Sequence, residues 1–197
     1  MVLLVCIALP ARAADGGYFI AVGEVNTERA QDYETFLEKV APVWGRHGMG
    51  LVLRAKTRFV LEAQGEPVPT DIAVLRYESR AGFNAYLRDP DYQAIKGLRT
   101  GAMESLAIME AQAGRMDGLK FIANTPMALV QFSGQPTELS APAFVLKVDL
   151  VAPVKGSMAQ GWRAVRQVHF MPLTFEDNPM AAAGAGALLT LAGDLER

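Results

Sequence analysis

The feature that most constrains the fold is an order of segments that occurs twice between Gly17 and Ala111: a strand-like run, an amphipathic helix and another strand-like run. The strand-like runs are residues 18–25, 51–54, 72–77 and 106–110. This β-α-β-β-α-β order is typical of a split βαβ unit. It therefore predicts an α+β fold with a ferredoxin-like arrangement.

Two helices are expected between these strands. Apolar residues recur at three-to-four spacing from Ala30 to Trp44, which predicts a helix with one face in the core, and Gly48 lies just beyond its end. Ser79 is a suitable N-cap for the second helix. Pro90 interrupts that helix and begins a new helical segment, because proline suits a first turn.

Beyond Gly114 the pattern is weaker. Strands are expected at residues 127–132, 144–151 and 185–192, with a short helix from Ser157 to Val168. The segment from Phe19 to Val40 is faintly echoed between Phe144 and Val165, although a coincidence of strand-helix order explains the echo equally well. We predict a ferredoxin-like domain over 17–113 and a β-rich C-terminal region over 114–197. That region either extends the first domain or is a degenerate second copy of it.

Charge and hydropathy exclude two classes of partner. The net charge is −2 and basic residues are interspersed with acidic ones, so the sequence lacks the basic surface that nucleic acid requires. No apolar run approaches the roughly 18 residues that a membrane-spanning helix needs.

The first residues indicate export. An apolar run over 2–9 precedes Ala11-Arg12-Ala13, which resembles the cleavage site of a signal peptide over residues 1–13, although no basic residue precedes the run. The alternative is a buried N-terminal strand. We expect a periplasmic or secreted protein, and cleavage there would remove Cys6, the only cysteine.

Several segments together resemble a known family. They are Gly17-Tyr-Phe-Ile-Ala-Val, Tyr33 to Pro42 with Gly48-Met-Gly50 and Leu53-Arg54, the turn at Gly65, and Tyr86-Leu-Arg-Asp-Pro-Asp-Tyr92 with Arg99 beyond. Over about residues 17–111 the chain resembles the bacterial family called domain of unknown function 1330, of the dimeric α/β-barrel superfamily. It departs from the family at Ala55-Lys56, where paired glycines are usual.

The resemblance implies an architecture rather than an activity. It implies that two four-stranded sheets form a barrel, usually across a homodimer. A separate possibility is that the C-terminal half supplies the second sheet, which would make the chain an internal pseudo-dimer. The resemblance also implies a cleft between the sheet and its helices. Proteins with this fold include cofactor-free monooxygenases, haem-degrading enzymes and lactone isomerases, so the fold alone does not specify the chemistry.

The end of the first helix carries candidate functional residues. The helix dipole stabilises the charged form of His47, which would serve there as an acid, a base or an anion ligand. Trp44 and Arg46 are candidate ligand-binding residues beside it. The alternative is that His47 only caps the helix.

Three further residues are candidates. Arg54 on a strand would hold a carboxylate-bearing ligand, or else it is a surface arginine. Tyr92 and Arg99 share a helix face and would orient a small acid, phenol or quinone. Alternatively, Tyr92 packs in the core and Arg99 pairs with Glu104 or Asp91.

No metal or cofactor is predicted. His47 and His169 are the only histidines, and neither lies in a cluster of metal-ligating residues in the sequence. The first functional hypothesis is therefore a protein that binds a small apolar or aromatic acid in the cleft. The alternatives are a cofactor-independent monooxygenase or isomerase for a small aromatic or quinone-like substrate, with His47 or Tyr92 handling the proton and Arg54 as anchor, and a structural or interaction module without a ligand.

Overall fold

The computed structural model describes residues 16–63, 68–116, 126–135, 143–155, 164–173 and 187–196. The predicted signal peptide with Cys6, the Gly65 turn and the predicted helical residues 157–163 lie outside these ranges.

The first half alternates strands and helices. In chain order its elements are β1 (Gly17–Val25), the 3-10 helix η1 (Thr27–Arg29), α1 (Ala30–Arg46), β2 (Met49–Ala63), β3 (Asp71–Tyr77), α2 (Arg80–Arg88), α3 (Pro90–Ala102) and β4 (Met103–Arg115). The Ser79 side chain accepts a hydrogen bond from the backbone N–H of Gly82 and caps α2. Asp89 caps α3, whose first residue is Pro90, so the predicted break between two helical segments is confirmed.

In the second half the structure describes four strands, β5 (Met127–Ser133), β6 (Phe144–Lys155), β7 (Gln167–Leu173) and β8 (Ala187–Glu196). The predicted helix from Ser157 to Val168 is wrong where it can be compared, because Gln167 and Val168 begin β7. The first five residues of β7, from Gln167 to Met171, are all buried. A strand buried on both faces lacks the apolar-polar alternation by which strands are usually recognised.

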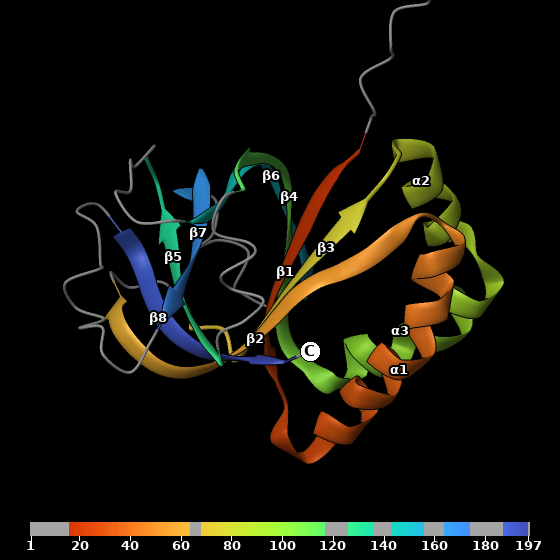
Figure 1. The fold of residues 1–197 in the computed structure, drawn as a ribbon. Coiled ribbons are helices and arrows are strands. Elements are labelled where there is room, and N and C mark those ends of the chain that lie inside the picture. The colour runs from red at the N-terminus through yellow and green to blue at the C-terminus, as the bar shows by residue number, and fades with distance from the viewer. Residues whose placement is uncertain are drawn as a thin grey trace, which may run out of the picture.

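All eight strands form one closed barrel in the order β1-β3-β2-β8-β5-β7-β6-β4, and every neighbouring pair is antiparallel. The first-half strands lie in the order β4-β1-β3-β2, and the second-half strands in the order β8-β5-β7-β6. The halves join where β2 pairs with β8 and where β4 pairs with β6. The fold is therefore α+β, with three α-helices together on one side of the barrel and β5, β7 and β8 on the other (Figure 1).

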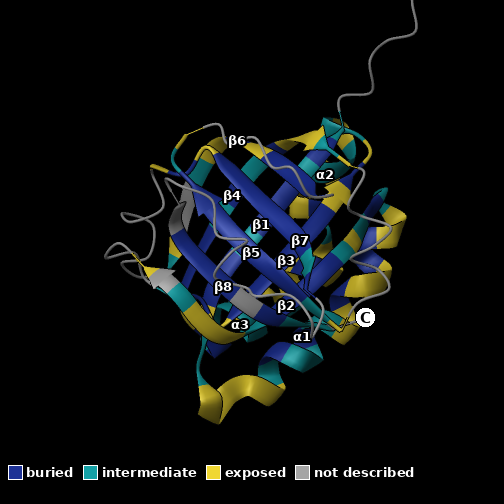
Figure 2. Ribbon diagram, turned by 60° about the vertical axis from the view of Figure 1, so that its left-hand side comes forward, coloured by how far each residue is buried: buried dark blue, intermediate teal, exposed yellow. Residues whose placement is uncertain are grey.

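Alternate residues of the first-half strands point to opposite faces of the sheet and so belong to two different hydrophobic cores. Ile20, Val22, Val130, Phe132 and Phe170 belong to the core inside the barrel, and all are fully buried. Burying a large apolar side chain stabilises the fold by about 1.5–3 kcal/mol relative to leaving it exposed. Figure 2 shows buried strands throughout the barrel and exposed outer faces on the helices.

The second core lies between the first-half sheet and the helices. Tyr33, Phe36, Val40 and Trp44 form the buried stripe of α1, as their spacing predicts, and they belong to this core together with Phe19 of β1. None of the described helices is long and apolar enough to cross a bilayer.

Candidate functional site

A cavity of about 250 Å³ lies within the second core, between the outer face of the sheet and the helices. Phe19, Ala21, Ala73 and Ile108 form part of its floor. Sixteen of the described residues line it: seven are aromatic, and the rest are aliphatic except for Arg99. Such a lining favours a largely apolar ligand with one polar group.

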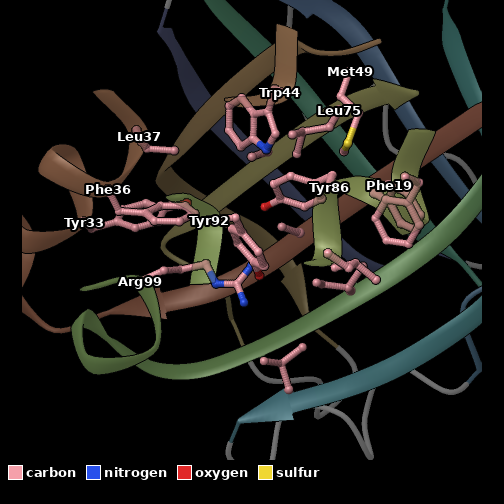
Figure 3. Close-up of a pocket in the computed structure, with 16 residues that line it drawn as sticks. Phe19, Tyr33, Phe36, Leu37, Trp44, Met49, Leu75, Tyr86, Tyr92 and Arg99 are labelled. Carbon is pink, nitrogen blue, oxygen red and sulfur yellow. The ribbon is translucent and has the colours of Figure 1, made fainter. Parts of the chain in front are cut away.

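Aromatic rings make the walls of the cavity (Figure 3). Tyr86 and Tyr92 have ring centroids 4.3 Å apart, and Phe19 stacks on Phe83 at 4.1 Å. The side chains of Trp44 and Tyr92 lie beside the Tyr86 side chain. Burial and the neighbouring Tyr92 raise the pKa of Tyr86. This phenol therefore stays protonated at neutral pH and is unsuited to act as a base.

Arg99 of α3 is the only charged side chain among the described residues that line the cavity. Its Nε is buried and has no hydrogen-bond partner. Its guanidinium carbon lies 5.6 Å from the centroid of the Phe36 ring. The carboxylates that the sequence suggested as partners are engaged elsewhere, because Asp91 pairs with Arg46 at 2.7 Å and Glu104 accepts a hydrogen bond from Asn26.

Arg54 lies behind one wall of the cavity rather than in its lining. It is 4% exposed, and its Nε donates to Asp71 Oδ2 at 2.7 Å while its two terminal nitrogens donate to Glu34 at 2.9 and 3.0 Å. The Tyr33 hydroxyl donates to Asp71 Oδ1 at 3.1 Å, and the Arg54 guanidinium lies over the Tyr33 ring. Burial, followed by the charge of Asp71, raises the pKa of Tyr33. Arg54 thus binds carboxylates of the protein itself, and its contact with a ligand stays a prediction.

His47 and Arg46 form a separate cluster at the end of α1. His47 Nε2 lies 2.8 Å from Asp89 Oδ2, and Arg46 contacts both Asp89 and Asp91. Hydrogen bonds with His47 and Arg46, of which the bond with His47 has the larger effect, hold the pKa of Asp89 well below its usual range. Because Asp89 is the N-cap of α3, this cluster ties the end of α1 to the junction between α2 and α3. The catalytic role of His47 stays a prediction.

The structure therefore brings Trp44, Tyr92 and Arg99 together in the cavity, but not the other three candidates. The sequence-based candidates omitted Phe36 and Tyr86, which line the cavity beside them. The available signal was the number of aromatic residues on the inner faces of the predicted helices, which also suits an ordinary core.

The second histidine lies on the other half of the barrel. His169 of β7 is fully buried, with Nε2 2.9 Å from Gln167 Oε1 and Nδ1 3.4 Å from Gln131 Oε1. Burial lowers the pKa of His169 to about 4, so the ring is neutral at pH 7. Within the described ranges, His, Cys, Asp and Glu side chains nowhere gather in threes as a metal site would require.

Comparisons with known proteins show the family of the first half of the chain. Residues 16–112 match the family model of DUF1330, a domain of unknown function. RPA0582, a protein of unknown function from Rhodopseudomonas palustris, is 18% identical over 50% of this chain and 82% of its own, with a TM-score of 0.45. The methylated form of RPA0582 is 17% identical over 51% of this chain and 82% of its own, with a TM-score of 0.46.

One solved structure is similar over nearly the whole barrel. An anthrone oxidase-like protein covers 94% of this chain and 93% of its own, with 9% identity and a TM-score of 0.57, which shows a shared fold. No curated protein matches the chain. The closed barrel is consistent with the dimeric α/β-barrel superfamily, and the N-terminal half of the chain, residues 16–112, belongs to the DUF1330 family.

Proposed function

We propose that this protein binds a small apolar or aromatic acid in the cavity between the sheet and the helices. The observation that carries the proposal is the lining, in which aromatic rings surround a space of about 250 Å³ next to one arginine. A cavity of about 150 Å³ holds benzene, so this one has room for a ligand larger than a single ring.

The size of the ligand limits its affinity. A two-ring ligand buries on the order of 200 Å² of apolar surface, as a large aromatic side chain does, which contributes about 5 kcal/mol. Lost translational and rotational freedom opposes binding, whereas stacking on Tyr92 and contact with Arg99 favour it. Dissociation constants between about 1 µM and 1 mM are expected.

Calorimetric titration with benzoate, 2-naphthoate and indole-3-acetate tests the proposal. Ala73→Leu should weaken binding at least tenfold, because Ala73 lies on the cavity floor and the larger side chain would occupy the space. Ala94→Leu makes the same chemical change at an exposed position of α3 and should leave binding unchanged. Circular dichroism checks the fold of each variant. The absence of saturable binding of all three acids to the folded protein would refute the proposal.

A cofactor-independent monooxygenase or isomerase for an aromatic or quinone-like substrate is the second candidate. The shared fold with an anthrone oxidase-like protein favours it. Against it, such a reaction needs a base that removes a proton from the substrate. The titratable side chains that line the described cavity are tyrosines and Arg99, none of which accepts a proton readily at neutral pH.

Oxygen uptake distinguishes a monooxygenase from a binding protein, and conversion of the substrate into an isomer, followed by chromatography, distinguishes an isomerase. Uptake with anthrone or a hydroquinone that disappears in His47→Ala or Tyr92→Phe, while binding persists, would support the enzyme. Saturable binding with neither oxygen uptake nor isomerisation of the ligand supports the binding protein.

We also infer that the first half is a ferredoxin-like unit and that the second half is a copy of it, so that the chain is an internal pseudo-dimer. The supporting observation is that β8-β5-β7-β6 repeats the order β4-β1-β3-β2. The registers agree as well: Ile20 of β1 pairs with Val74 and Met109, and Val130 of β5 pairs with Phe170 and Leu191.

The mass in solution tests this inference. Light scattering on the purified full chain should give a monomer of about 21.3 kDa. A stable dimer would support assembly through a homodimer instead.

A further inference from the structure

The positive charge of Arg99 is not neutralised within the part of the chain that the structure describes. Its Nε is buried without a hydrogen-bond partner, and no described carboxylate forms an ion pair with it. The Arg99 side chain as a whole is half-buried, and its guanidinium carbon lies 5.6 Å from the centroid of the Phe36 ring, a favourable cation–π distance. A half-buried cation at an apolar cavity, with one buried N–H that lacks a partner, favours an anionic group on the ligand.

The cavity differs in polarity between its ends. Figure 3 shows Arg99 near Phe36 and Tyr33 at one end, and Phe19, Met49 and Leu75 at the other. Trp44, Tyr86 and Tyr92 lie between these ends. The Tyr33 hydroxyl already donates its hydrogen bond to Asp71. Arg99 is therefore the main hydrogen-bond donor for a ligand at this end of the cavity.

Resting on the proposed function, we propose that Arg99 selects the ligand class: a planar aromatic monocarboxylate whose carboxylate pairs with Arg99 and whose rings extend toward Phe19. Tyr86 and Tyr92, with ring centroids 4.3 Å apart, provide aromatic surface against which a flat ring system packs. An arginine fork matches the geometry of a carboxylate and binds it bidentately.

The same geometry excludes ligands with a second charge. Phe19, Met49 and Leu75 offer a second carboxylate neither a cation nor a side-chain hydrogen-bond donor. A dicarboxylate would therefore leave one charge buried and unpaired, which opposes binding. A neutral carboxamide of the same shape keeps the ring contacts but loses the ion pair.

Three ligands of one shape test the proposal by calorimetry at pH 7: 2-naphthoate, 2-naphthamide and naphthalene-2,6-dicarboxylate. The wild-type protein should bind 2-naphthoate about 10- to 100-fold more tightly than 2-naphthamide, as expected for a hydrogen-bonded charge. It should bind the dicarboxylate at least tenfold more weakly than 2-naphthoate.

Variants locate the effect. Arg99→Met should reduce the affinity for 2-naphthoate at least tenfold and leave that for 2-naphthamide within about twofold. Arg99→Lys should retain part of the preference. Lys96→Met removes the same charge at an exposed position of α3, one turn away, and should change neither affinity.

The outcomes distinguish this inference from the proposed function. Equal affinity of the wild-type protein for 2-naphthoate and 2-naphthamide overturns the role of Arg99 but leaves the aromatic site standing. Equal losses of affinity for 2-naphthoate in Arg99→Met and Lys96→Met also overturn the role of Arg99, because a charge outside the cavity would then act as strongly as Arg99. If none of these ligands binds to the folded wild-type protein, the proposed function fails as well. Should Arg99→Met not fold, the comparison of the three ligands on the wild-type protein decides.

Discussion

Replacing Arg54 by methionine tests how β2 supports the wall of the cavity. The guanidinium of Arg54 joins Asp71 of β3 to Glu34 of α1, and it lies 5.0 Å from the centroid of the Tyr33 ring. Methionine keeps an unbranched side chain and removes the cation. Asp71, which is 2% exposed, then loses the charge that compensates its burial.

The magnitude follows from the burial of each partner. Removing one member of a buried ion pair costs about 3–5 kcal/mol, because the other charge stays in the core. Glu34 has a side chain 38% exposed, so the loss of its bond to Arg54 adds at most about 1 kcal/mol. A loss of about 3–5 kcal/mol corresponds to a melting temperature about 6–20 °C lower for a chain of this size.

Urea denaturation at pH 7 measures the loss. Lys56→Met is the matched control, because Lys56 also contacts Glu34 but its side chain is 44% exposed, and it should cost about 1 kcal/mol or less. The double variant Arg54→Met with Asp71→Leu should recover much of the stability, since both buried charges are then absent. A loss below about 1 kcal/mol in Arg54→Met, or no recovery in the double variant, would refute this account of the ion pair.

Three further stability predictions follow from single residues. His169 has a folded-state pKa of about 4, below its ordinary value of about 6.5, so the unfolded state takes up more protons than the folded state as the pH falls from 7 to 4. The wild-type protein should therefore lose about 3 kcal/mol more than His169→Phe over this range, and equal slopes in urea denaturation would contradict this. Ser79→Ala removes the cap of α2 and should cost about 1 kcal/mol, whereas Thr35→Ala, on the exposed face of α1, should be nearly neutral by thermal denaturation. Gly48 has a φ of 65°, so Gly48→Ala should lower the free energy of unfolding by about 1–2 kcal/mol through backbone strain. Gly50→Ala is the control, because an added Cβ there meets no atom within 4 Å and it should cause no such loss. Similar losses in both variants would argue against backbone strain.

The helices and strands of the first half could be predicted because their patterns are local. Tyr33, Phe36 and Trp44 lie at helical spacing, and Pro90 marks the start of α3. The strand β2 was less clear, because it is one strand of fifteen residues with register shifts in its pairing. Such irregularities interrupt the two-residue alternation that identifies a strand.

The site could be predicted only in part, because charges are paired across distant segments. The sequence identified Trp44, Tyr92 and Arg99, which do share the cavity. It could not show that His47 meets Asp89, 42 residues away, or that Arg54 meets Asp71, 17 residues away. These partners depend on tertiary packing, and they determine whether a charged side chain is available to a ligand.

If the second half is an internal copy, as we propose, the comparison of the two halves shows why it is hard to recognise from sequence. The faint echo aligned Phe19 with Phe144, that is β1 with β6, whereas the strand order relates β1 to β5. If the halves are related as we propose, their inward residues keep the same apolar character, as Ile20 and Val130 do, because both fill one barrel. The outward residues are free to differ.

That difference bears on function. Ala21 and Ala73, paired across β1 and β3, are small and lie on the floor of the cavity. The corresponding pair across β5 and β7 is Gln131 and His169, whose larger polar side chains are fully buried and in contact with each other. An apolar ligand resting on this second pair would have to pack against two buried polar side chains and disturb the hydrogen bond between them, which opposes binding. If the cavity binds an aromatic acid as we propose, only one half of the barrel should hold it, and calorimetry should find one 2-naphthoate per chain rather than two.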